Sequence, residues 1–241
     1  IAAGSDKNAL EVYYKMGEDG ASLDAAQALT YDLARRLRAD AEAKLLLPGN
    51  YKVLREARVP AVLLESSYMT HADNAAFLAT EPAVEAEALA IAAGLAEYFR
   101  SDPPRVVSAR LVEPEGPAPR IEAHFASTAP LDPASVEVLH DGQPLPGRAE
   151  AAGGVLQWIS AGPLPNGPCA FEVRARNTRG AAVTFPVEGR VSRAPAALVV
   201  SQHPAGALPA ESTAEALFEV RAVDAFGFPV AEGAVNLDQP S

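Results

Sequence analysis

The 241-residue sequence is poor in cysteine, with Cys169 standing alone. A single cysteine excludes an intrachain disulfide and any metal site built from several thiolates. The redox compartment stays open, because exported bacterial proteins can do without disulfides. Long apolar runs are missing as well, since no stretch approaches the ~18 to 20 consecutive apolar residues of a membrane-spanning helix. The sequence therefore predicts neither a disulfide-stabilised fold nor a membrane span.

Basic residues are also scarce. The 20 lysines and arginines face 31 aspartates and glutamates, which gives a formal net charge of -11. This balance argues against nucleic acid or an anionic membrane surface as a partner. The chain opens on Ile1 and not on methionine, so the missing basic and apolar signal segment says nothing about export. We therefore expect the natural N-terminus to lie upstream of Ile1. Because the last β unit is incomplete, we also expect the natural C-terminus to lie beyond Ser241.

The first hundred or so residues carry patterns typical of an α/β domain. Leu10–Tyr14 is a short run rich in strand-forming residues, and Ser22 offers an N-cap to a helix with apolar residues at helical spacing. The continuous apolar run Val59–Leu64 is typical of a strand covered by helices on both faces, and so of a parallel sheet. A second amphipathic helix is expected from about Thr80–Pro82 to Tyr98.

A domain boundary is expected at Ser101–Pro104, because proline supplies no backbone donor and restricts the residue before it. Beyond it the apolar period changes to two, and turn pairs such as Asp141-Gly142 separate short strands. The sequence thus predicts a partial, mostly parallel α/β sheet with helices in residues 1–102. An all-β sandwich is predicted to follow in residues 105–192.

A further β unit is expected to open near Ala196. Alternating apolar residues predict a strand over Ala216–Ala222, and Asp224–Val230 and Gly233–Leu237 are typical of a turn and of another strand. Fewer residues remain than the ~100 of a complete sandwich. Residues 196–241 are therefore interpreted as the start of a second sandwich domain.

The segment Arg55–Leu78 carries the most specific pattern in the chain. Its apolar strand Pro60–Leu64 ends in Glu65, and a Tyr-Met-Thr turn and a short helix follow. The segment resembles the last motif of the zinc-dependent N-acetylmuramoyl-L-alanine amidases of type 3, in which a Pro-Ala-Val-Leu-Val-Glu strand ends in the catalytic glutamate. Upstream, Glu11–Tyr14 looks like the strand that follows the family's second histidine ligand. The resemblance makes the α/β half the C-terminal part of an amidase catalytic domain.

Two positions depart from the family, because Ser67 replaces its usual glycine and His71 its usual asparagine. Both substitutions lie in the turn after Glu65. The family's zinc ligands, two histidines and a glutamate, would all fall upstream of Ile1. The resemblance therefore implies zinc as the cofactor of the intact protein, no metal ligand within this chain, and an inactive fragment.

Glu65 is the candidate catalytic residue. The resemblance implies that it helps to deprotonate a zinc-bound water and then protonates the leaving amine, while zinc polarises the amide carbonyl. The bond cut would join N-acetylmuramic acid to L-alanine, with peptidoglycan as the substrate. Independently of any family, the end of a buried parallel strand is where α/β sheets place their ligands. The alternative is that Glu65 is only the first solvated residue after a core strand.

Weaker signals come from four more side chains in this half. Arg55 matches an arginine of the family and is a candidate to bind a substrate carboxylate or Glu65, or else is an ordinary surface residue. Tyr13, Tyr14 and Tyr68 either line a glycan groove or pack beside the strands.

The histidines and serines do not form a recognisable catalytic set. His71 is a candidate to face the cleft, whereas the remaining histidines are expected at the surface or in turns, since no His-x-x-Glu-His spacing occurs. These are His124, His140 and His203. Ser66 and Ser67 lack the context of a serine nucleophile. An α/β-hydrolase remnant is therefore disfavoured.

The β-rich half resembles extracellular modules. Residues 105–192 resemble a bacterial immunoglobulin-like domain through Leu164–Gly180, and the following residues resemble the start of an invasin-type repeat through Phe218–Val230. Trp158 is expected in the sandwich core. Such modules space an enzyme from the cell surface or bind wall polymer. We expect a periplasmic or extracellular protein associated with the cell wall.

A second hypothesis from a different class stays open. The chain can also be a non-catalytic stalk or adhesin fragment whose α/β domain is degenerate. A zinc-binding histidine and glutamate pattern upstream of Ile1 would favour the enzyme, and its absence would favour the stalk.

Overall fold

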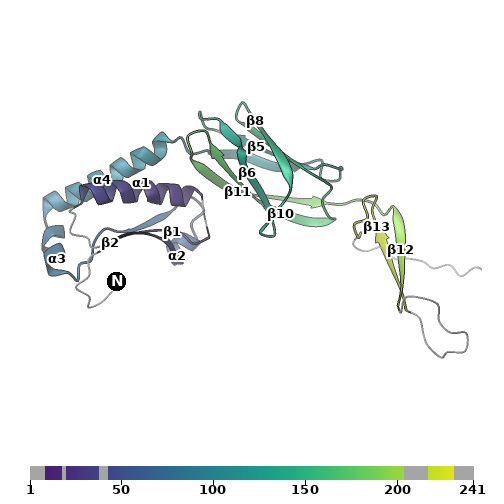
Figure 1. Cartoon of the computed structure of the whole chain (residues 1–241), viewed down its shortest axis with the longest axis horizontal. Helices are drawn as coiled ribbons and strands as arrows, with labels where there is room; N and C mark the ends of the chain where they lie inside the picture. The colour runs from purple at the N-terminus through teal and green to yellow at the C-terminus, as the bar shows by residue number, and fades with distance from the viewer. Residues whose placement is uncertain (1–8, 18–19, 38–42, 204–216, 231–241) are drawn as a thin grey trace, which may run out of the picture.

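The computed structural model describes residues 9–17, 20–37, 43–203 and 217–230. They form three consecutive parts, which we name the α/β part, the sandwich and the ribbon (Figure 1). The α/β part holds β1 (Ala9–Lys15), α1 (Ala21–Arg36), β2 (Ala43–Gly49), α2 (Lys52–Arg55), β3 (Val62–Glu65), α3 (Ala72–Leu78) and α4 (Glu81–Arg100). The sandwich holds β4 (Val106–Val112), β5 (Arg120–Phe125), β6 (Leu131–His140), β7 (Gln143–Pro144), β8 (Gly147–Ala152), β9 (Val155–Ser160), β10 (Gly167–Asn177) and β11 (Ala182–Val191). The ribbon consists of β12 (Ala197–His203) and β13 (Leu217–Val223).

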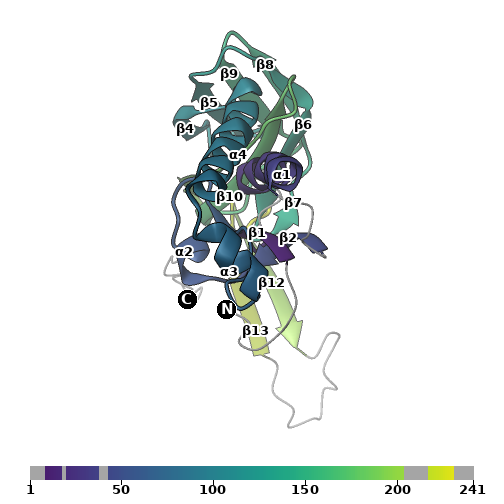
Figure 2. The ribbon, with the colours of Figure 1, turned by 90° about the vertical axis from the view of Figure 1, so that its left-hand side faces the viewer.

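The α/β part is a small sheet covered by two helices. Side-chain alternation turns Leu10 and Val12 of β1 toward α1, where they pack against Leu29 and Leu33 in one buried cluster. The second long helix, α4, packs on α1 (Figure 2). On the opposite face of the sheet, the short α2 is the main covering element among the described residues. The strand and the two amphipathic helices expected from the sequence are confirmed.

The sheet is not mostly parallel, which corrects the expectation drawn from Val59–Leu64. Its order is β2-β1-β3, and β1 runs parallel to β2 but antiparallel to β3. All four residues of β3 are half-buried. A continuous apolar run indicates burial, but it carries no information about strand direction, which depends on how the chain returns through α2.

The start of α1 also differs from expectation. Gly20, not Ser22, occupies the N-cap position. Ser22 is 1% exposed, and its Oγ accepts the N–H of Ala61 at 3.2 Å. The serine therefore ties α1 to the segment that enters β3. The start of α4 is as expected, because Thr80 is its N-cap and a proline lies in its first turn.

The sandwich consists of two four-stranded antiparallel sheets, ordered β4-β5-β9-β8 and β11-β10-β6-β7. Apolar side chains from both sheets form one continuous core, and Trp158 lies in it with 3% exposure. Asp141-Gly142 and Gly153-Gly154 have positive φ angles, as two-residue hairpin turns of this hand require. The change of apolar period after Ser101–Pro104 is thus confirmed as a change from α/β to antiparallel β structure.

A buried ion pair joins the sandwich to the ribbon. The guanidinium of Arg193, in the connection between β11 and β12, contacts the Asp224 carboxylate at 3.0 Å and the Leu164 carbonyl at 2.7 Å. Burial by itself would raise the pKa of Asp224, but hydrogen bonds from the N–H groups of Phe226 and Phe228 and from Arg193 hold this pKa below its ordinary value. The ribbon is therefore attached to the end of the sandwich by a satisfied polar network.

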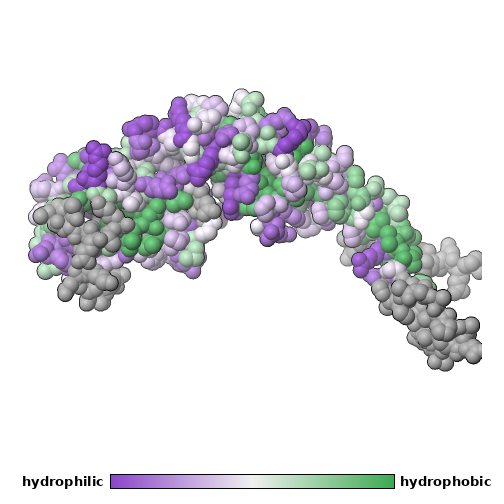
Figure 3. All heavy atoms as spheres, viewed as in Figure 1, coloured by the Kyte–Doolittle hydropathy of each residue, from purple (hydrophilic) through white to green (hydrophobic). Residues whose placement is uncertain are grey.

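The ribbon carries exposed apolar residues (Figure 3). Leu198, Val200 and Phe218 are all more than half exposed. The strand expected over Ala216–Ala222 and the turn after it are confirmed in β13 and in the turn at Asp224–Gly227. The strand expected at Gly233–Leu237 lies outside the described residues.

None of the helices in the described part of the chain is long and apolar enough to cross a membrane.

The close contact of α1 and α4 yields a stability prediction. A Cβ added at Gly94 would lie 2.8 Å from Leu29 Cα and 3.1 Å from Ala28 O. Although alanine favours a helix by about 1 kcal/mol over glycine, the overpacking against backbone atoms costs about 1 to 3 kcal/mol. We expect Gly94→Ala to lower the free energy of unfolding by up to about 2 kcal/mol, measured by urea denaturation. Gly162→Ala is the control, because a Cβ there meets no atom within 4 Å. A Gly94→Ala protein more stable than the parent would contradict the packing argument.

Candidate functional site

Glu65 is the last residue of β3 and lies half-buried on the face of the sheet away from α1. Its direct partner on the neighbouring strand is Glu11 of β1. Directly opposed residues of antiparallel strands project from the same face, so the two carboxylates are neighbours. Glu65 therefore does not end a buried parallel strand, as the sequence suggested, but ends an antiparallel one that borders a more open face.

Glu11 is held by two tyrosine hydroxyls. Tyr13 donates to its Oε2 at 2.5 Å, and Tyr68, from the turn after β3, donates to its Oε1 at 2.6 Å. Burial is the largest cause that raises the pKa of Tyr13, and the hydrogen bond to Glu11 is the second. The hydrogen bond to Glu11 is the main cause that raises the pKa of Tyr68 to about 12, and the charge of Glu65 adds to it. Both phenols are therefore protonated donors at neutral pH.

These contacts give the two carboxylates different surroundings. Glu11 is neutralised in part by its two donors, and Tyr13 is braced by an edge-on contact with the Tyr51 ring at 4.9 Å between centroids. The carboxylate of Glu65 has no hydrogen-bond or ion-pair partner among the residues that the structure describes. The arrangement therefore positions the Glu11 carboxylate and leaves the Glu65 carboxylate unengaged. An unengaged carboxylate can accept a proton from a group that lies within hydrogen-bond reach.

The side chains of Tyr14, Ser66 and Arg55 make their observed contacts with residues other than Glu11 and Glu65. Tyr14 packs with the buried cluster under α1, on the other face of the sheet. Ser66 donates to Glu87 Oε1 of α4 at 2.5 Å. Arg55 is exposed, and its guanidinium donates to the carbonyl of Asn50 at 2.6 Å and to the side-chain oxygen of Asn50 at 3.2 Å. The structure brings together Tyr13 and Tyr68 but not Arg55 with Glu65, and a role for Arg55 toward substrate stays a prediction.

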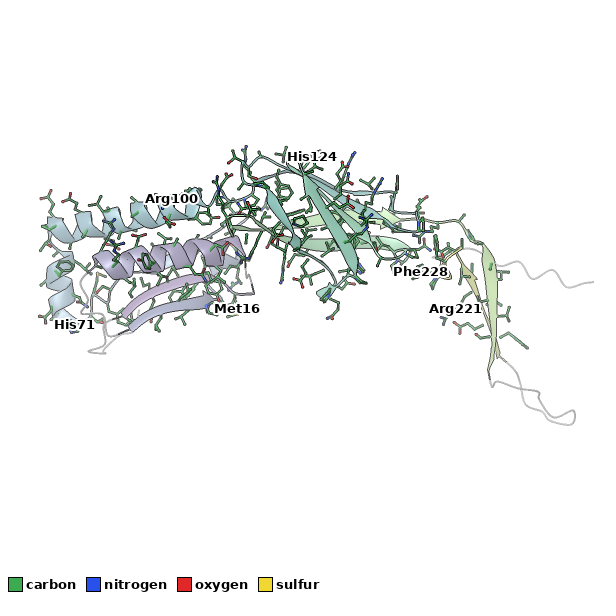
Figure 4. All side chains as sticks on the ribbon, turned by 45° about the horizontal axis from the view of Figure 1, so that its top comes forward. Met16, His71, Arg100, His124, Arg221 and Phe228 are labelled. Atoms are coloured by element: carbon green, nitrogen blue, oxygen red, sulfur yellow. The ribbon has the colours of Figure 1, made fainter. Side chains whose placement is uncertain are left out.

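The histidines are dispersed. His71 occupies the N-cap position of α3 at the end of the α/β part farthest from the sandwich (Figure 4), and its Nδ1 is buried without a partner among the described residues. His124 is exposed beside Glu122. His140 lies against the ring of Phe171 at 5.2 Å.

Zinc does not fit the described residues. Within the described ranges no three histidine, cysteine, aspartate or glutamate side chains stand close enough to hold a metal ion. Catalytic zinc needs three protein ligands and an open position, whereas the cluster on the open face supplies only Glu11 and Glu65. We therefore derive no chemical step through a metal.

The comparisons with known proteins concern this same half of the chain. Residues 2–97 match the family model described as N-acetylmuramoyl-L-alanine amidase. The amidase resemblance of the first hundred residues is thereby confirmed for the α/β part. The match stops before the sandwich, whose assignment as immunoglobulin-like stays a prediction.

Solved amidase structures are also similar. The amidase AmiC2 of Nostoc punctiforme is 26% identical with a TM-score of 0.37, over 42% of this chain and 53% of that one. The catalytic domain of the amidase CwlV from Bacillus (Paenibacillus) polymyxa var. colistinus is 32% identical with a TM-score of 0.36, over 41% and 52%. The amidase of Clostridium difficile 630 is 22% identical with a TM-score of 0.38, over 42% and 53%. The chain spans about half the length of these amidases. No curated protein matches the chain.

The sequence did not predict the hydrogen bonds from Tyr13 and Tyr68 to Glu11. A weak signal existed, because Glu11 is a charged residue inside a strand-forming run and shares a strand face with Tyr13. Tyr68 is 57 residues away along the chain, so its contact with Glu11 depends on the pairing of β1 with β3.

The tyrosine network predicts a titration shift. Glu11→Gln removes the charge that disfavours the phenolate, so we expect the pKa of Tyr68 to fall from about 12 toward the ordinary value of about 10. The ring-carbon NMR signal of Tyr68, assigned with Tyr68→Phe, measures this value. Glu85→Gln is the control, because Glu85 is an exposed carboxylate on α4. An unchanged Tyr68 titration in Glu11→Gln would contradict the network.

The same shift has a consequence for stability. Because the pKa of Tyr68 in the fold lies above its ordinary value, the protonated phenol contributes stability below about pH 10. This contribution is lost as the pH rises through about 12. The difference in urea midpoint between the parent and Tyr68→Phe should therefore shrink from pH 8 to pH 11.

Proposed function

We propose that residues 1–102 are the C-terminal part of the catalytic domain of a zinc-dependent N-acetylmuramoyl-L-alanine amidase. The intact enzyme would hydrolyse the amide bond between N-acetylmuramic acid and L-alanine in peptidoglycan. The observation that carries this proposal is the family match over residues 2–97. The unengaged carboxylate of Glu65, next to the positioned Glu11, supports it.

Glu65 is the proposed general base and acid. One carboxylate oxygen of Glu65 accepts a proton from the attacking water, whose oxygen bonds to the amide carbon. The same proton then passes to the amide nitrogen as the carbon–nitrogen bond breaks, so that the amine leaves neutral. Because Tyr13 and Tyr68 donate to Glu11 and not to Glu65, the Glu65 oxygens stay available for this transfer.

Substrate contacts are proposed around this carboxylate. Arg55 is exposed, and the planar donor fork of its guanidinium suits a carboxylate of the peptide stem. Zinc dependence rests on the family likeness alone, and this chain is proposed to be inactive by itself.

The β-rich parts are proposed to support action at the cell wall. Residues 105–192 would be an immunoglobulin-like domain, and residues 196–241 would begin a second one. Their antiparallel sheets and the exposed apolar ribbon are compatible with spacer modules or with contact to wall polymer. The protein would then act in the periplasm or outside the cell, with peptidoglycan as its partner.

A second candidate function is a non-catalytic surface stalk with a degenerate α/β domain. The described residues offer no three-residue metal ligand set, which both candidates expect because the enzyme's ligands would lie upstream of Ile1. The two candidates differ in whether the natural full-length protein releases stem peptide from cell wall.

The role of Glu65 is tested by Glu65→Gln in the natural full-length protein. Glutamine keeps the size and one acceptor oxygen but cannot transfer a proton, so we expect kcat to fall ~10²- to 10⁴-fold with little change in KM. Release of stem peptide from purified cell wall, at matched zinc content, measures the loss. Glu85→Gln, an exposed change on α4, should keep parental turnover. A Glu65→Gln enzyme that keeps more than about a tenth of parental kcat would remove Glu65 from the mechanism.

A zinc measurement tests the ligand assignment. We expect this chain alone to show no tight stoichiometric zinc in equilibrium dialysis and no release of stem peptide from purified cell wall, since its described residues lack a ligand set. The natural full-length protein serves as the positive control. Tight binding by the isolated chain, lost on replacing three residues within 1–102, would contradict the alignment with the family.

A further inference from the structure

The hairpin turn between β10 and β11, residues 177–181, lies against the α/β part, and we name it the docking turn. Asn177 organises it and is 2% exposed. Its Oδ1 accepts the N–H groups of Arg179 at 3.0 Å and Ala181 at 2.9 Å, which closes the turn. Its Nδ2 donates across the junction to the carbonyls of Ser101 and Asp102, both at 2.8 Å. A single buried amide thus shapes the turn and attaches it to the end of α4.

The docking turn completes the C-terminal end of α4. The last carbonyls of a helix have no partner within the helix and must find one elsewhere. Here Arg179 donates to the carbonyl of Arg100 at 3.4 Å, next to the two carbonyls that Asn177 engages. These partners come from the sandwich, 75 to 79 residues further along the chain. If the two parts separated, these carbonyls would have to accept hydrogen bonds from water instead.

A second contact joins the sandwich to the first turn of α1. The Asp24 carboxylate accepts the N–H of Ala182 at 2.7 Å and the guanidinium of Arg176 at 3.2 Å. Arg176 also donates to the carbonyl of Gly180 at 2.5 Å, so the ion pair is braced against the docking turn. The Asp24 side chain is only 16% exposed. Partial burial leaves such a pair less screened by solvent than an ion pair on an open surface.

The connection between α4 and β4 is itself hydrogen-bonded to the sandwich through Asp102. Asp102 adopts a left-handed conformation with φ of 53°, directly before Pro103 and Pro104. Its carboxylate accepts the N–H of Thr128 at 2.6 Å, the hydroxyl of Thr128 at 2.7 Å and the N–H of Ala129 at 2.6 Å. The short connection is therefore stiffened by two prolines and fastened to the sandwich.

Figures 1 and 4 show where this junction lies relative to the candidate site. Met16, just after β1, is at the end of the sheet that faces the sandwich, and His71 is at the opposite end. Tyr68 lies with His71 in the connection between β3 and α3, and Glu65, the last residue of β3, pairs with Glu11 near the start of β1. The sandwich thus joins the α/β part at the end away from the candidate site.

We propose that the docking turn fixes the sandwich to the α/β part in one orientation, as a rigid arm that presents the Glu65 face away from the β-rich parts. Relative motion is the default for two parts joined by a small polar interface. Here the contacts at α1, at α4 and at the connection each use a directed hydrogen bond of a buried or half-buried group. Rotation of the sandwich about the connection would break the hydrogen bonds at α1 and at the end of α4. The sandwich is then a spacer of fixed direction, whatever chemistry the α/β part performs.

Distances between two spin labels test the orientation. Labels are attached to Glu85→Cys on α4 and Glu188→Cys on β11, both exposed positions, in a Cys169→Ala background that removes the single native cysteine. We expect the parent to give one narrow distance distribution. The double variant Asp24→Ala/Asn177→Ala removes two of the side chains that hold the α/β part to the docking turn and its flanking strands. Its distribution should be about twofold wider.

A matched control separates the junction from general effects of truncation. Asp73→Ala/Gln143→Ala removes an exposed first-turn aspartate of α3 and an exposed amide of β7, and should keep the parental distribution. Circular dichroism verifies that each variant is folded. If the double variant unfolds, Asp24→Asn replaces it, because asparagine keeps an acceptor for Ala182 but loses the charge that attracts Arg176; its distribution should still be wider than the control's. A broad distribution in the parent, or a folded junction variant as narrow as the control, would overturn the proposal.

Discussion

The candidate site depends on the register in which β3 pairs with β1. In that register Glu65 stands opposite Glu11, and both project from the face of the sheet away from α1. Two like charges in direct opposition are unfavourable, and the fold offsets this by giving Glu11 the hydroxyls of Tyr13 and Tyr68. A slip of one residue would turn the Glu65 side chain toward the apolar cluster under α1. The same apolar cluster that stabilises the α/β part therefore also fixes which carboxylate is engaged and which is available.

Helix α1 connects this site to the rest of the molecule. Its buried face packs on β1, and its contact with α4 is close enough that Gly94 approaches the backbone of Leu29. Its first turn carries Asp24, whose carboxylate accepts the N–H of Ala182 in the sandwich. Strand, helix pair and sandwich are thus joined through one element, so a displacement at the junction acts on the same helix that supports β1.

The two junctions of the chain use the same physical principle. Asn177 at the first and Arg193 with Asp224 at the second are buried polar groups whose hydrogen bonds are all made within the protein. Such groups are costly when they lose a partner, because the remaining one stays desolvated. Apolar contacts alone would tolerate sliding, whereas directed hydrogen bonds select one arrangement. The arm would therefore owe its direction to a small number of polar residues.

Local sequence was sufficient for much of this protein. The alternation around Leu10–Tyr14 and the two helical periods after it predicted the strand and the two long helices, because each depends on neighbours in the chain. The motif ending in Glu65 indicated the amidase family. Only the tertiary structure decided the antiparallel direction of β3, the pairing of Glu11 with Tyr68 and the attachment of Asn177 to α4. Periodicity reports which side chains face the core, but partners 57 or 75 residues apart meet only through the path by which the chain returns.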